Sequence, residues 1–225
     1  MPARDEEGNL ARLVDEVRRT LDGTGLVWEL VVVDDASADG SAALLDRLAA
    51  GEPRLHPVHL DRPSGQTAAL RAGFDVAGGG LIATMDADLQ CPASDLISLL
   101  KVLGDADMAC GIRTSRHDPL SRKVASTLAN GTRRLFLAPR LRDLAGPLRV
   151  FRRDALAHVT ARWTLFDGAH RWLPALFHLA GLRVVQRPVA HCPRTAGTSK
   201  YTTRGRLLPI SRELLQVLRM RAARP

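Results

Sequence analysis

The apolar positions in the first half of the chain follow two periods. A one-sided helical stripe is formed by Leu10, Leu13, Val14, Val17 and Leu21. This spacing predicts an amphipathic helix that begins near residues 5–7 and ends at Gly23. Short segments at 28–33, 55–60 and 81–85, each with several apolar residues, instead predict strands.

Helices are expected between these strands, so the first half reads as repeated β-α units. That order predicts a parallel sheet covered by helices on both faces. After Gly111 the pattern loosens. There we expect helices at 121–137, 152–159, 168–179 and 204–224, with strands at 146–151 and 182–189.

The run 81–85 leads directly into Asp86-Ala87-Asp88. Side chains of an extended chain alternate between faces, so both carboxylates should point the same way. Two carboxylates at the carboxyl end of a buried strand suit Mg²⁺ or Mn²⁺, and open α/β sheets bind ligands at this edge. The alternative is a strand end followed by a carboxylate that starts a helix.

Composition narrows the class of partner. The 225 residues suit one domain, with 45% hydrophobic and 25% charged residues and a formal net charge of +8. The positive charge favours anionic ligands, whereas 4% aromatic residues argue against a nucleic acid partner. Three cysteines without a Cys-x-x-Cys motif, and the lack of a long apolar run, predict a cytoplasmic protein.

Five motifs then occur in a specific order. They are Pro-Ala-Arg-Asp-Glu-Glu, Val-Val-Val-Asp-Asp-Ala-Ser-Ala-Asp-Gly, Gly-Gln-Thr-Ala-Ala-Leu-Arg-Ala-Gly, Met-Asp-Ala-Asp-Leu-Gln-Cys-Pro and Arg-Thr-Ala-Gly-Thr-Ser-Lys-Tyr. With them the chain resembles inverting family 2 glycosyltransferases of the GT-A fold. It resembles most the branch of dolichyl-phosphate mannose synthases and bacterial polyprenyl-phosphate glycosyltransferases.

The resemblance implies an α/β, Rossmann-like GT-A domain with a mostly parallel central sheet over residues 1–203. Its nucleotide-binding half would span about 1–111 and its acceptor half about 112–203. Residues 204–225 would form a basic amphipathic tail.

The resemblance also implies a set of site residues. The nucleotide-sugar would contact Pro2, Arg4, Glu6, Val33, Asp35, Asp86, Ala87 and Gln90. Mg²⁺ or Mn²⁺ would lie among Asp86, Asp88 and Gln90. The catalytic residues would be Asp88, Arg113, Arg194 and Lys200. Arg122 and Ser126 would face the acceptor phosphate, unless they form only a solvated helix face.

The expected reaction transfers a sugar from a nucleotide-diphosphate-sugar, such as GDP-mannose or a UDP-sugar, to a polyprenyl or dolichyl phosphate. Such an acceptor is already anionic, so it needs no general base. One alternative is a hydroxyl acceptor with Asp143 or Asp167 as base, although we interpret Asp143 as structural. Another is a non-catalytic nucleotide-binding protein. His170 lies where relatives can carry Lys, and is either functional or structural.

Two departures from the family pattern carry expectations of their own. Relatives have an apolar strand before the proline that corresponds to Pro2, whereas here only Met1 precedes it. We therefore expect either further residues upstream or a compensated sheet. The tail is expected either to contact an anionic membrane surface on the cytoplasmic face or to pack on the domain.

Overall fold

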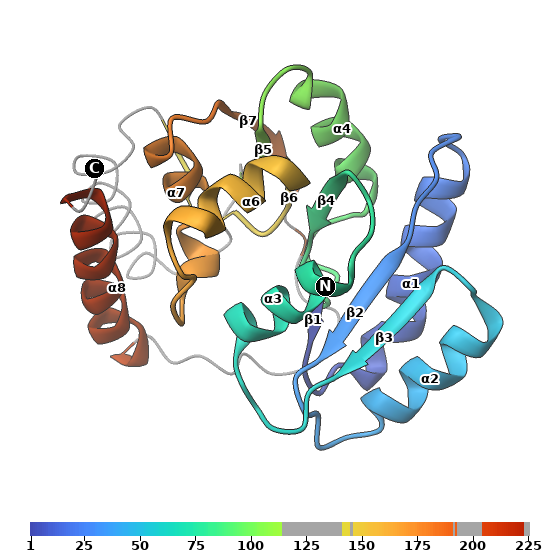
Figure 1. Ribbon diagram of the computed structural model, residues 1–225. Coiled ribbons are helices and arrows are strands. Elements are labelled where there is room, and N and C mark those ends of the chain that lie inside the picture. The colour runs from blue at the N-terminus through green and yellow to red at the C-terminus, as the bar shows by residue number, and fades with distance from the viewer. Residues whose placement is uncertain (114–140, 145, 191, 193–203, 223–225) are drawn as a thin grey trace.

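The computed structural model describes residues 1–113, 141–144, 146–190, 192 and 204–222 (Figure 1). In chain order its first elements are β1 (Pro2–Ala3), α1 (Glu7–Asp22), β2 (Leu30–Asp34), α2 (Ser41–Gly51), β3 (Leu55–His59), α3 (Gln66–Val76), β4 (Leu81–Thr84), α4 (Ser94–Leu103) and β5 (Met108–Arg113). The rest are β6 (Arg149–Arg152), α6 (Arg153–Arg162), η1 (Ala169–Arg171), α7 (Leu173–Leu179), β7 (Val184–Val189) and α8 (Arg204–Ala222). The helix expected at 121–137 lies outside the described residues.

The strands form two sheets. The first is parallel, in the order β1-β2-β3, and the second has the order β4-β6-β5-β7. In the second sheet β6 runs antiparallel to both β4 and β5, while β5 and β7 are parallel. The α/β class is confirmed, but the parallel pairing expected from the β-α repeats stops at β4.

Alternation along β2 explains how the first sheet is covered. Leu30 and Val32 belong to the core that α1 and α2 share, whereas Val31 and Val33 pack against Ala69 of α3. Successive side chains of a strand point to opposite faces. The run Leu-Val-Val-Val therefore has helices on both sides, as Figure 1 shows.

Between β2 and β4 lies an apolar slot of about 900 Å³. Residues 26–31 line one wall and residues 77–85 the other. Met1 closes one end, where its amine donates to the Val31 carbonyl at 2.6 Å and its carbonyl accepts from Val33 at 2.8 Å. The two-residue strand β1 thus extends one wall only, and β2 and β4 stay in separate sheets, as expected if no strand lies between them.

The tail helix α8 packs on the domain. Val217 is fully buried and belongs to the same apolar core as Trp172 and Phe177. The Trp172 indole donates to Glu213 at 2.8 Å, and Arg171 forms an ion pair with the same carboxylate at 3.3 Å. We expected the tail either to contact a membrane surface or to pack on the domain. Its apolar face packs on the domain. None of the helices in the described ranges is both long and apolar enough to cross a bilayer.

Candidate active site

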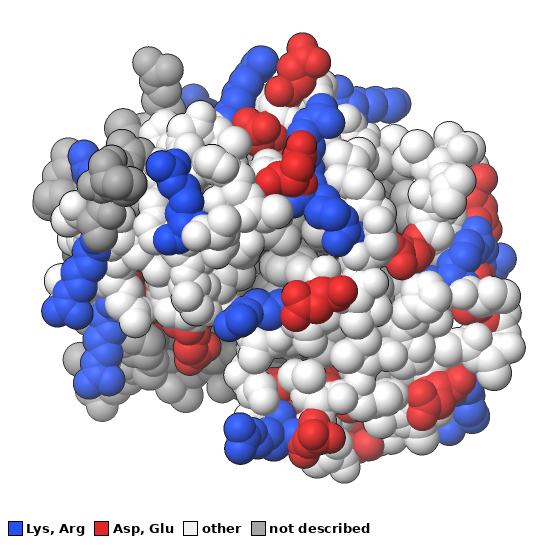
Figure 2. All heavy atoms as spheres, viewed as in Figure 1, with Lys and Arg blue, Asp and Glu red and all other residues white. Residues whose placement is uncertain are grey.

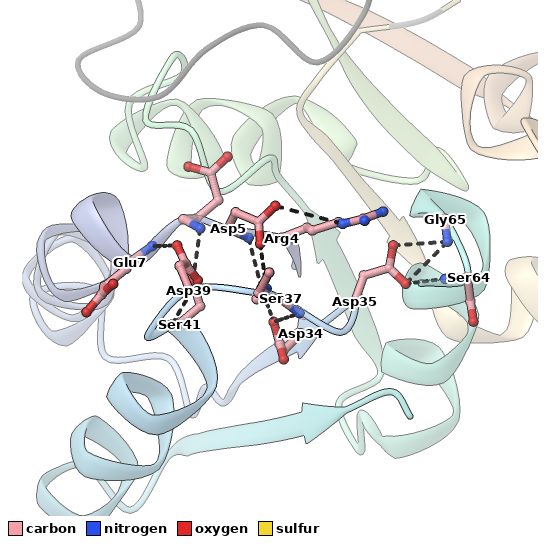
Figure 3. Close-up of polar contacts among 12 residues, drawn as sticks. Arg4, Asp5, Glu7, Asp34, Asp35, Ser37, Asp39, Ser41, Ser64 and Gly65 are labelled. Atoms are coloured by element: carbon pink, nitrogen blue, oxygen red, sulfur yellow. Dashed lines mark hydrogen bonds and ion pairs between the residues drawn. The ribbon is translucent and has the colours of Figure 1, made fainter. Parts of the chain in front are cut away.

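Two loops at the carboxyl ends of β1 and β2 clamp each other (Figure 3). The backbone amide of Asp5 donates to Ser37 Oγ at 2.8 Å, and the Ala38 amide donates back to Asp5 Oδ1 at 2.7 Å. A third bond joins the same two loops, in which the Gly40 amide donates to Glu7 Oε2 at 3.0 Å. These reciprocal bonds hold the loop that carries Arg4 beside the end of β2.

The Asp34-Asp35 pair orders two turns. Asp34 Oδ1 accepts from the backbone amide and the hydroxyl of Ser37. Asp35 accepts from the Ser64 amide at 2.6 Å and from the Gly65 amide at 3.0 Å, so it fixes the turn before α3 (Figure 3). Both residues therefore order turns, and contact between Asp35 and the nucleotide-sugar stays a prediction.

Asp86 and Asp88 lie in a turn after β4, which ends at Thr84. Strand alternation therefore does not bring the two carboxylates together, contrary to our expectation. The turn does so instead, and Leu89 within it adopts a left-handed φ of 56°. The same uncommon conformation occurs at Asp5 and Ala36. Non-glycine residues in this region cluster at functional sites.

Asp86 has an unusual electrostatic environment. Burial, and after it the nearby Asp88 charge, raise the pKa of its carboxyl to about 6. The cations of Arg149 and Arg113 oppose this shift, as does a 2.9 Å hydrogen bond from Gln66 Nε2. Two carboxylates held together at this cost suit a hard divalent cation, which would favour the ionised form of both.

The donor set fits such an ion only in part. Within the described ranges, no three His, Cys, Asp or Glu side chains come together as a metal site. Gln90 points its amide toward the Cys192 carbonyl at 3.4 Å. Asp86 and Asp88 are thus the carboxylates that would hold the ion, and Mg²⁺ typically completes such a site with water and substrate phosphates.

Arg113 forms a two-pronged ion pair with Asp143. Its Nε and Nη2 donate to the two carboxylate oxygens at 3.0 and 3.3 Å, and Asp143 is only 4% exposed. The pair is held between β5 and the turn before β6. Gly146 is required there, because a Cβ at this position would collide with the Gly111 carbonyl. Asp143 is therefore engaged in structure, as we interpreted it from the sequence.

His170 is uncharged at neutral pH. Burial, with Arg171 and Arg149 nearby, lowers its pKa to about 3. Thr67 Oγ1 accepts from the Gly168 amide at 3.0 Å and forms a second hydrogen bond, of 2.8 Å, with His170 Nδ1. A neutral ring cannot supply the charge of a lysine, which favours the structural reading.

The other residues named from the sequence are distributed as follows. Pro2 and Val33 are paired in register across β1 and β2, and Val33 is fully buried. Glu6 accepts from the Asn9 side chain at 2.6 Å, and Ala87 is buried in the turn after β4. Arg122, Ser126, Arg194 and Lys200 lie outside the described residues, so their roles stay predictions.

Sequence reasoning missed Arg149 and Gln66. Arg149 begins β6 and is 5% exposed, and Gln66 begins α3 and reaches Asp86. A signal existed for the first, because a lone arginine interrupts the apolar run Leu148 to Phe151. An arginine in a strand that is otherwise buried needs a partner.

Solved structures share this fold. Glucosyl-3-phosphoglycerate synthase from Mycobacterium tuberculosis, in complex with Mn²⁺, UDP-glucose and glycerol 3-phosphate, aligns over 100% of this chain and 79% of its own, with TM-score 0.67 and 21% identity. A mannosyltransferase from Pyrobaculum calidifontis, in complex with GDP-mannose and Mn²⁺, aligns over 87% of this chain and 56% of its own, with TM-score 0.60 and 20% identity. These enzymes have the GT-A fold, which this chain therefore shares.

Sequence relatives are more similar. Undecaprenyl-phosphate 4-deoxy-4-formamido-L-arabinose transferases from Pectobacterium carotovorum and Aeromonas hydrophila are 34% and 32% identical over 208 and 203 residues. These matches cover 90% and 89% of this chain, and the chain spans 61% of the length of each relative. The family model "Glycosyl transferase family 2" matches residues 1–160. The chain therefore belongs to glycosyltransferase family 2.

Proposed function

We propose that the protein transfers a glycosyl group from a nucleotide-diphosphate-sugar to a polyprenyl phosphate, with inversion. The observation that carries this proposal is the Asp86–Asp88 turn, which places two carboxylates beside the Arg113 and Arg149 cations. The names of the sequence relatives support the acceptor class, and the Mn²⁺ complexes of the fold neighbours support the metal.

Each part of the site has a task in this reaction. The clamped loops carry Arg4 and Asp35 and would hold the nucleotide. Asp86 and Asp88 would hold Mg²⁺ or Mn²⁺, which supplies positive charge where the diphosphate departs. A phosphate oxygen of the acceptor would form the new bond to the anomeric carbon while the bond to the diphosphate breaks. Arg113 would stabilise the charge that develops.

The environment of Asp143 supports an acceptor that brings its own negative charge. A hydroxyl acceptor needs a carboxylate base, and both oxygens of Asp143 are bound by Arg113. The other candidate, Asp167, is exposed and lies beside the Gly65 turn. A phosphate monoester is already ionised and needs neither residue.

The test is a transfer assay with purified protein and Mn²⁺. UDP- and GDP-sugars are offered with either a short polyprenyl phosphate or the corresponding free alcohol. We expect product from the phosphate alone, and an Asp167→Asn variant with unchanged turnover. Transfer to the alcohol that Asp167→Asn abolishes would instead establish the hydroxyl reaction. Nucleotide binding without transfer to either acceptor would instead favour the hypothesis of a non-catalytic nucleotide-binding protein.

We further propose that the tail brings the protein to the inner face of an anionic membrane, through charge alone. Among the tail side chains that the structure describes, Arg212, Arg219 and Arg221 are exposed. Figure 2 shows basic side chains at the left edge, where Figure 1 places α8, whereas acidic and basic ones mix elsewhere on this face. Basic residues contribute about 1 kcal/mol each near such a surface. Sedimentation with anionic liposomes should therefore show binding that disappears as salt is raised.

A further inference from the structure

Arg149 is a buried cation for which the described residues provide no partner. Its side chain is 5% exposed, and its Nε has no hydrogen bond. No ion pair or hydrogen bond joins its guanidinium to any residue in the described ranges. A buried charge without a partner destabilises the folded protein. Burial accordingly lowers the pKa of this guanidinium.

A second unsatisfied group lies directly opposite. Thr84 of β4 pairs with Arg149 of β6, and Thr84 Oγ1 is also buried without a hydrogen bond. Side chains of paired residues lie on the same face of a sheet. The guanidinium of Arg149 and the hydroxyl of Thr84 therefore lie side by side. Thr84 is two residues before Asp86 in the chain.

The surrounding charges show which kind of ligand fits. Arg149 is close enough to Asp86 and Asp143 for both carboxylates to act on its pKa. Both are already committed, since Asp143 is held by Arg113 and Asp86 accepts from Gln66. The nearby His170 is neutral. The pair of Arg149 and Thr84 thus offers hydrogen-bond donors to an anion with several oxygens.

The position of Arg149 favours the phosphate of the acceptor over the diphosphate of the nucleotide-sugar. The loops that would hold the nucleotide extend from the first sheet, whereas Arg149 and Thr84 belong to the second. Asp86 follows β4 of the second sheet and accepts from Gln66 of α3. An anion at Arg149 would therefore lie against the second sheet, whereas the nucleotide loops extend from the first.

We propose that Arg149, with Thr84 beside it, binds the phosphate group of the acceptor. This inference rests on the proposed function and names a residue of the acceptor side of that same site. The described residues leave the guanidinium without a hydrogen-bonding partner, and the phosphate monoester would give the buried charge its counter-ion.

The experiment measures phosphate binding separately from turnover. Calorimetry compares the wild type with Arg149→Gln for two ligands, geranyl phosphate and the nucleoside diphosphate of the active donor with Mn²⁺. We expect Arg149→Gln to weaken geranyl phosphate binding roughly 10- to 100-fold, because hydrogen bonds to a charged group are lost. Binding of the nucleotide should change less than about threefold, and in turnover the acceptor KM should rise.

Arg187→Gln is the charge-matched control. Arg187 is exposed on β7, which belongs to the same sheet but does not pair with β6, and its loss should leave geranyl phosphate binding unchanged. Equal weakening by both variants would show general electrostatics instead. Equal loss of nucleotide and geranyl phosphate affinity in Arg149→Gln would mean that Arg149 acts through Asp86. Either result overturns the proposal.

Stability provides a second readout. Removing a buried cation that lacks a partner relieves a desolvation cost, so ligand-free Arg149→Met should melt at or above the temperature of the wild type. A large fall would make Arg149 structural and overturn the inference. If the wild type transfers sugar to no polyprenyl phosphate, the proposed function fails. If it does so and Arg149→Gln keeps the acceptor KM, only the role of Arg149 fails.

Discussion

The buried amine of Met1 allows us to predict how the free energy of unfolding changes with pH. It is buried at the end of the slot between β2 and β4, and burial lowers its pKa from 8.0 to about 5. Between these values the unfolded chain carries a proton that the folded chain does not. The free energy of unfolding therefore rises with pH in this window, by about 1.4 kcal/mol per unit. From pH 5 to pH 8 this amounts to about 4 kcal/mol.

The perturbation is an extension of the chain before Met1. Because Pro2 pairs with Val33 in parallel register, five added residues would lie opposite residues 27–31, along the slot. One extension carries five Val and Ile residues, and a matched one carries Gly and Ser. Both turn the buried amine into an amide, so both should gain about 4 kcal/mol more at pH 5 than at pH 8.

The two extensions differ in what they bury. Only the apolar extension can fill the slot, so only it should also stabilise the protein at pH 8. Urea unfolding at pH 5, 6, 7 and 8 gives the required free energies, and 4 kcal/mol corresponds to a shift in Tm of roughly 8–16 °C. If the stability of the original and both extended chains changes equally with pH, the amine is not buried as described and the reasoning fails.

Four further results are expected at the site and in the tail. Asp88→Ala should abolish turnover and weaken Mn²⁺ binding, measured by calorimetry with the nucleotide present, while circular dichroism stays unchanged; full activity after EDTA treatment would contradict metal dependence. Because the pKa of Asp86 is raised to about 6, Mn²⁺ affinity should be constant above that pH and fall up to tenfold per unit below it, and a flat profile down to pH 5 would refute the assignment. Glu213→Ala leaves a buried indole N–H without an acceptor and should lower stability by about 1–3 kcal/mol in urea unfolding, whereas no change would show that α8 is not docked in solution. Arg194→Ala and Lys200→Ala should reduce kcat more than nucleotide affinity, and an equal loss of both would make them plain binding residues.

The sequence by itself determined the local elements and the position of the Asp86–Asp88 carboxylates. The stripe from Leu10 to Leu21 predicted α1, and the apolar runs predicted β2, β3 and β4. These inferences hold because helical and strand periods reflect which face of an element is buried. The motif Asp-Ala-Asp after an apolar run likewise located the carboxylates, although the reason given for their proximity was wrong.

Only the tertiary structure decided which groups meet. The sequence separates Arg113 from Asp143 by 30 positions and Thr67 from His170 by 103, and no local pattern links either pair. The neutral state of His170, the burial of the Arg149 cation and the docking of α8 through Glu213 all depend on contacts between distant elements. Burial sets the cost of a charge, and that cost depends on the whole packed environment rather than on the neighbouring residues in the chain.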